Sequence, residues 1–122
     1  MAGGFRAKRV YDDPSAEDGL RILVDRLWPR GVSKERARLD EWAKDVAPSD
    51  ELRRWFHATP EERRGEFAER YAAELDGPDQ QRRLAELRAQ AAEQTVTLLT
   101  ATKDLEHSHV AVLLQCISQS AD

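Results

Sequence analysis

The stretch LRILVDRLWPRG, residues 20–31, decides the fold class of this chain. Apolar side chains follow one another almost without a break from Leu20 to Leu27, as expected of a strand that is buried on both faces of a sheet. The strand then has to stop, because Pro29 cannot donate to a β-ladder and Gly31 permits a turn. This stretch therefore predicts a buried strand with a turn directly after it.

The segments on either side alternate between strand and helix patterns. Two further strands are expected at Arg6–Tyr11 and Thr95–Thr100. Helices are expected over about residues 34–46, 50–57 and 106–119, with two more on either side of Gly77-Pro78. This alternation predicts an α/β class: a small layered fold with a short, mainly parallel sheet of about three to four strands flanked by helices. Residues 1–122 are expected to form one domain, with Met1–Gly4 disordered.

The connection between the first two predicted strands is short. Asp12–Gly19 holds eight residues, whereas a helical crossover between parallel strands needs about ten or more. Either the first two strands pair antiparallel, or the crossover is reduced to a loop. Both arrangements remain open at this point.

The composition excludes several classes of protein. Hydrophobic residues make up 40% of the chain and charged residues 34%, which is too apolar for a disordered chain and too polar for a membrane protein. Cys116 is the single cysteine and cannot form an internal disulfide, so we expect a cytoplasmic protein without a membrane partner. The net charge of −4 argues against a nucleic-acid partner, since such binding depends on clustered cations.

Polar residues gather in two segments, each directly after a predicted strand. Ligands bind outside the carboxyl ends of parallel strands, so the two segments would face each other across a cleft if their strands run parallel. The candidate catalytic residues are Asp25 and Asp104, and the candidate ligand-binding residues are Arg26, Trp28, Arg30, Lys103, Ser108 and His109.

The leading interpretation is a site for an anionic small molecule such as phosphate, a nucleotide or a carboxylate. Arg26 and Arg30 would clamp the anion, and Lys103 would add positive charge. Trp28 would supply a wall, and Asp25 would orient the ligand or accept a proton from it. The site could either bind this ligand or act on it as an enzyme.

Two other interpretations remain open. The charged residues could form a structural network in which Asp25 pairs with Arg21 or Arg26 and Asp104 caps the last helix. The chain could instead be a non-catalytic protein-interaction or regulatory module that uses the charged helices of residues 50–93. In that case those helices should carry an exposed apolar patch.

No metal or cofactor site is expected. His107 and His109 lie two residues apart, so on a helix their side chains diverge and cannot share a metal. His57 adds no known ligand spacing. The chain also lacks a glycine-rich phosphate loop, because Gly19 and Gly31 are isolated.

Blocks of residues along nearly the whole chain resemble one known family. They are Lys8–Asp12, Asp18–Gly19 with Arg21–Gly31, Trp42–Lys44, Pro48–Ser49 with Glu51–Arg53, the helix of Phe67, Tyr71 and Leu75, and Leu98–Asp104. The pattern is similar to the YeaO-like branch of the domain-of-unknown-function family 488. This resemblance implies a bacterial cytosolic α/β protein whose shared polar residues lie on the two loops described above.

The resemblance also implies a difference in chemistry. Wider members of the family carry cysteines and a Cys-His-Arg run in the last loop, whereas the matching positions here are Thr100, Ser108, His109 and Val110. Thiol chemistry is therefore not expected of this chain. A site based on arginine and aspartate is compatible with the difference.

Overall fold

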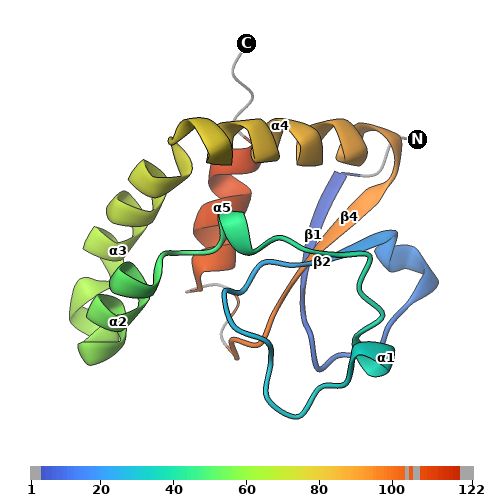
Figure 1. Ribbon diagram of the computed structural model, residues 1–122, viewed down its shortest axis with the longest axis horizontal. Helices are drawn as coiled ribbons and strands as arrows, with labels where there is room; N and C mark the ends of the chain where they lie inside the picture. The colour runs from blue at the N-terminus through green and yellow to red at the C-terminus, as the bar shows by residue number, and fades with distance from the viewer. Residues whose placement is uncertain (1–3, 104, 106–107, 119–122) are drawn as a thin grey trace.

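The computed structural model describes residues 4–103, 105 and 108–118 (Figure 1). Four strands form one sheet in the order β1-β4-β2-β3, and every neighbouring pair is parallel. They are β1 (Gly4–Arg9), β2 (Leu20–Leu23), β3 (Glu41–Trp42) and β4 (Thr95–Thr100). The predicted small α/β fold with a short parallel sheet is confirmed. Gly4 belongs to β1, so the expectation of disorder is wrong for that residue, and residues 1–3 lie outside the described residues.

Helices surround this sheet. The described α-helices are α1 (Lys34–Ala37), α2 (Asp50–Ala58), α3 (Pro60–Leu75), α4 (Pro78–Glu93) and α5 (His109–Ser118), and the described 3₁₀ helices are η1 (Ala16–Asp18) and η2 (Lys44–Val46). None of these described helices combines the length and the apolar character that crossing a bilayer requires.

The first connection is a crossover reduced to a loop, which decides between the two arrangements that the sequence left open. β1 pairs with β4 rather than with β2, and β4 lies between them. The loop passes close to the first half of β4, where the Thr97 hydroxyl donates to the Asp18 carbonyl at 2.7 Å. Gly19 follows at φ 62°, and a Cβ there would lie 2.1 Å from the Thr95 carbonyl oxygen. Glycine is therefore the residue that this crossing requires.

The sheet is buried on both faces, as the apolar run in β2 predicted. Alternate side chains of a strand point to opposite faces. Ile22 and Leu98 pack into a larger cluster with α3, α4 and α5, whereas Leu23 and Leu99 pack into a smaller cluster beside α1 (Figure 1). Leu27 departs from the prediction: β2 ends at Leu23, and the Leu27 side chain is 58% exposed.

The helix expected over residues 34–46 is wrong beyond its first turn. Arg38 adopts a left-handed conformation at φ 48° and ψ 48° and ends α1, after which the chain extends into β3. Long-range bonds to β2 and to the loop after it hold this segment, since Ala43 donates its N–H to the Leu23 carbonyl at 2.8 Å and the Trp42 indole donates to the Asp25 carbonyl at 2.6 Å. Pairing with β2 thus overrides the local helical spacing.

A buried ion cluster fastens the first connection to the sheet. The Asp18 carboxylate is fully buried and pairs with Lys8 Nζ at 3.1 Å and with the Arg21 guanidinium. Burial alone would raise the pKa of Asp18, but hydrogen bonds from the Ser15 amide, Lys8 and Arg21 lower it below the ordinary value. The pairing of Asp25 with Arg21, one of the two pairings considered for a structural network, does not occur, because Arg21 pairs with Asp18.

Candidate functional site

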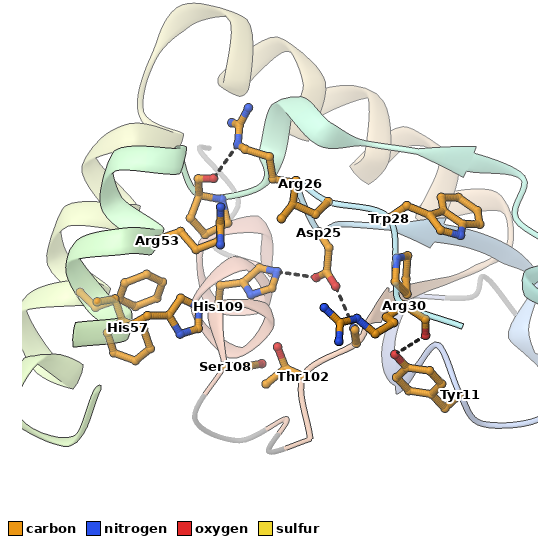
Figure 2. Close-up of a pocket in the computed structure, with 16 residues that line it drawn as sticks. Tyr11, Asp25, Arg26, Trp28, Arg30, Arg53, His57, Thr102, Ser108 and His109 are labelled. Atoms are coloured by element: carbon orange, nitrogen blue, oxygen red, sulfur yellow. Dashed lines mark hydrogen bonds and ion pairs between the residues drawn. The ribbon is translucent and has the colours of Figure 1, made fainter. Parts of the chain in front are cut away.

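The loops that follow β2 and β4 leave the sheet at the same edge. β2 and β4 are parallel neighbours with Leu23 opposite Leu99, so their carboxyl ends lie side by side. A cavity of about 360 Å³ lies there, between the two loops and helices α2 and α3 (Figure 2). The predicted meeting of the two loops is confirmed. Six of the predicted site residues line the cavity: Asp25, Arg26, Trp28, Arg30, Ser108 and His109.

Asp25, just beyond β2, joins the two loops. The Thr100 hydroxyl donates to its Oδ1 at 2.7 Å, and the Ala101 N–H donates to its Oδ2 at 2.8 Å. His109 Nε2 lies 3.1 Å from Oδ1. Burial alone would raise the pKa of this carboxyl, but the His109 ring, the Ala101 amide and the Thr100 hydroxyl lower it below the ordinary value of an aspartate.

His109, the first residue of α5, has a defined arrangement of ring nitrogens. Its Nε2 lies 3.1 Å from Asp25 Oδ1 and 3.0 Å from the Val24 carbonyl oxygen. An ionised carboxylate and a carbonyl can only accept, so Nε2 carries a proton. The ring also stands edge-on to Tyr71 with their centroids 6.0 Å apart. His109 is therefore held by the contacts of its Nε2 and by a T-shaped ring contact with Tyr71.

Arg26 has a structural role. Its Nε donates to the Pro48 carbonyl at 2.8 Å, and an Nη lies 3.5 Å from the Ala47 carbonyl. Figure 2 shows the side chain extending from the β2 loop toward the segment before α2. The guanidinium thus bonds backbone carbonyls, and the pairing of Arg26 with Asp25 that the structural network would have needed does not occur.

Arg30 differs from Arg26 in having a free guanidinium. It is exposed, and its side chain has no hydrogen-bond or ion-pair partner among the residues that the structure describes. Figure 2 shows the guanidinium on the side of the cavity where Asp25 and Thr102 lie. The Tyr11 hydroxyl donates to the Arg30 carbonyl at 3.1 Å, so the backbone is held while the charged end is free.

Trp28 stabilises the loop after β2. Its indole donates to the Val32 carbonyl at 2.6 Å, and its ring meets Trp42 edge-on with centroids 5.3 Å apart. These contacts fix the ring, which lines the cavity from the side of the β2 loop.

The other predicted residues divide into structural and peripheral ones. Ser108 accepts the Val110 N–H at 3.2 Å and donates to the Leu105 carbonyl at 2.9 Å, so this hydroxyl caps α5. The capping role considered for Asp104 is therefore taken by Ser108, and Asp104 itself lies outside the described residues. Lys103 is exposed and does not line the cavity.

Helices α2 and α3 add residues that the sequence analysis did not place in the site. Phe56 and Phe67 pack with ring centroids 4.3 Å apart and form an apolar wall, beside which His57 also lines the cavity. Arg53 lines it from α2, where its Nε is buried without a hydrogen-bond partner among the described residues. The one available signal was that Arg53 ends a block shared with the resembled family.

The lining carries more positive than negative charge. Arg26, Arg30 and Arg53 face a single carboxylate among the described lining residues, that of Asp25. The Asp25 oxygens already take three internal contacts, so this carboxylate does not neutralise the free Arg30 guanidinium, while Arg53 has one long contact, 3.5 Å, to Asp50 outside the lining. The cavity can therefore accommodate an anion, with an apolar wall beside it.

Comparisons with known proteins place the chain in a family. A family model described as the inactive DUF488-N3 subclade matches residues 4–122. The chain belongs to the DUF488 family. An uncharacterized protein of Mycobacterium tuberculosis, Rv3073c, is 49% identical over 113 residues, which cover 93% of this chain and 92% of the relative. YeaO of Escherichia coli, also uncharacterized, is 46% identical over 110 residues, 89% of this chain and 92% of the relative. No solved structure matches the chain.

Membership of DUF488 confirms the resemblance to its YeaO-like branch. Where that resemblance implies cysteines in wider members, this DUF488 chain has Thr100, which holds Asp25, and Ser108, which caps α5. Cys116 does not line the cavity, and burial raises the pKa of its thiol. The described lining of this DUF488 cavity thus contains hydroxyl groups and no thiol.

Proposed function

We propose that this DUF488 chain binds an anionic small molecule, such as phosphate, a nucleotide or a carboxylate, in the cavity at the strand ends and leaves it chemically unchanged. The observation that carries the proposal is the Arg30 guanidinium. It lies at the cavity without a partner among the described residues, and the carboxylate of the described lining, that of Asp25, is already engaged. A free guanidinium offers paired N–H donors that match the oxygens of a phosphate or carboxylate.

The rest of the lining supplies a second charge and a wall. Arg53 approaches from α2, on the opposite side of the cavity from Arg30, so the two arginines would neutralise an anion from two directions (Figure 2). Trp28, Phe56 and Phe67 would contact the apolar part of the ligand. A volume of about 360 Å³ is large enough for a small phosphorylated or carboxylated metabolite.

Three side chains at the cavity that could perform chemistry, those of Asp25, Thr100 and Ser108, are already used in the fold. The lowered pKa of Asp25 makes it a weak base at neutral pH. The Ser108 hydroxyl caps α5 and the Thr100 hydroxyl holds Asp25, so neither is free to act as a nucleophile. The matching family model is described as inactive. These observations favour binding without turnover.

The alternative of a protein-interaction module finds less support. It required an exposed apolar patch on the helices of residues 50–93. The large apolar side chains that are exposed among the described residues are Tyr11 and Leu27, and both line the cavity rather than those helices. The exposed apolar surface therefore favours a ligand at the cavity.

Thermal denaturation in the presence of phosphates, nucleotides and carboxylates tests the proposal. A ligand at one hundred times its dissociation constant stabilises the folded state by about 2.7 kcal/mol. We expect at least one anion to raise the melting temperature and Arg30→Ala to abolish that rise. Arg54→Ala is the matched control, because Arg54 is an exposed arginine that does not line the cavity. Stabilisation by none of the anions, or equal stabilisation of Arg30→Ala, would overturn the proposal.

A further inference from the structure

The His109 ring has one nitrogen that the fold does not use. Nε2 is engaged by Asp25 and by the Val24 carbonyl. Nδ1 has no hydrogen-bond partner among the described residues. It is also not buried, so solvent reaches it. Because the ring lines the cavity, this nitrogen is available to a ligand there. In a neutral ring whose proton is on Nε2, Nδ1 is a hydrogen-bond acceptor.

The contacts of the His109 ring disfavour a flip that would interchange Nε2 and Nδ1. Turning it over would remove the Nε2 proton from two acceptors at once, Asp25 Oδ1 and the Val24 carbonyl. Asp25 cannot follow such a turn, since Thr100 and Ala101 hold its two oxygens. Tyr71 packs against the ring in a T-shaped arrangement. The acceptor is therefore presented in a fixed place, beside an otherwise cationic lining.

We infer that the cavity selects an anion that carries its own proton, namely inorganic phosphate or a singly protonated phosphate monoester, over a fully deprotonated anion. This inference rests on the proposed anion site. Arg30 and Arg53 would bind the charged oxygens, and the P–OH group would donate to His109 Nδ1. Ionised carboxylates and sulfate have no such proton, so one of their oxygens would face the Nδ1 lone pair.

Sulfate is the matched probe for this inference. At neutral pH it has nearly the size and charge of hydrogen phosphate but carries no proton. A site built to accept a hydrogen bond from its ligand discriminates against an analogue that lacks the donor, because a polar group is then left unpaired. The difference between the two anions thus reports on the acceptor alone, while the attraction to the arginines stays the same.

Isothermal titration with sodium phosphate and sodium sulfate, at neutral pH and equal ionic strength, tests the inference. We expect phosphate to bind at least about tenfold more tightly than sulfate. Equal binding of the two anions would overturn the inference and leave the proposed anion site intact. If neither anion binds while another anion does, the inference also fails. If no anion binds at all, the proposed function itself fails.

His109→Gln tests the residue directly. Glutamine keeps an amide N–H for Asp25 and Val24 but removes the ring nitrogen that faces the cavity. We expect its phosphate affinity to fall about tenfold, to that of sulfate, while sulfate affinity changes less than about twofold. Arg54→Gln is the control, because Arg54 is exposed and does not line the cavity, so this variant should keep the preference for phosphate.

A second measurement keeps the inference testable if His109→Gln does not fold. Nitrogen-15 NMR of the wild-type histidine rings in the presence of phosphate distinguishes the protonated from the unprotonated nitrogens. We expect His109 to show a proton on Nε2 and none on Nδ1. Protons on both nitrogens would mean that the ring donates to the anion, and the inference would be wrong.

Discussion

Two arginines four residues apart in the same loop should respond in opposite ways to removal. Arg26 donates to the Pro48 carbonyl at 2.8 Å and approaches the Ala47 carbonyl, and both of these residues are buried. Arg26→Ala therefore leaves a carbonyl group without its charged donor in a place where water has little access. A hydrogen bond of this kind contributes about 1.5–3 kcal/mol. The long contact to Ala47 adds little.

For Arg30→Ala we expect almost no effect on the fold. Its side chain has no partner among the described residues, and exposed substitutions of this kind change stability by about 0.5 kcal/mol or less. Its effect should instead appear in binding, as loss of the stabilisation that the anion provides to the wild type. Arg26→Ala should retain that stabilisation, measured relative to its own unliganded form.

Urea denaturation followed by tryptophan fluorescence measures both variants. The expected loss of unfolding free energy for Arg26→Ala would also appear in thermal denaturation, as a melting temperature lowered by about 5–12 °C. Arg26→Lys should recover part of it, because a lysine still offers one charged donor to Pro48. The reasoning is refuted if Arg30→Ala destabilises the protein by more than about 1.5 kcal/mol, or if Arg26→Ala leaves stability unchanged.

Further predictions concern the strand ends and the first crossover. Asp25→Asn should cost about 1–3 kcal/mol in urea denaturation, since an amide group cannot accept from all three donors; an unchanged midpoint would contradict the contacts described. Gly19→Ala should cost more than about 2 kcal/mol, because its Cβ would meet the Thr95 carbonyl, whereas Gly65→Ala, with open space around it in α3, should be neutral or stabilising in the same assay. The folded-state pKa values of Asp18 and Asp25 are lowered, so their contribution to stability is complete above the unfolded pKa of about 3.9 and is lost as the pH falls through the lower folded values. Urea midpoints should therefore fall as the pH is lowered below about 4, and they should fall less steeply for Asp25→Asn than for the wild type. The same dependence of midpoint on pH in both proteins would contradict the lowered pKa of Asp25.

The sequence predicts the parts of the fold that local patterns determine. The apolar run from Leu20 and the run Thr95–Thr100, which is rich in β-branched residues, define two neighbouring strands, and the helical spacing of Leu84, Leu87 and Ala91 defines α4. It fails over residues 34–46, where the spacing of Leu39 and Trp42 imitates a helix. Long-range pairing with β2 determines that segment, and no local pattern reports such pairing.

The site was predictable to the extent that it depends on strand direction. Once β2 and β4 are parallel neighbours, Asp25, Arg30 and His109 have to share one edge of the sheet. Phe56 and Phe67 could not be assigned to the site from the sequence, because helical spacing does not distinguish an aromatic residue in the core from one in a cavity wall. Likewise, what holds Arg26 is a carbonyl group 22 residues away in the chain.

A crystal structure of the protein with phosphate tests the central claim most directly. The account predicts phosphate in the cavity between the loops after β2 and β4, in contact with the Arg30 guanidinium and with His109 Nδ1. Phosphate bound elsewhere on the protein, or a cavity that stays free of it at saturating concentration, would contradict the account.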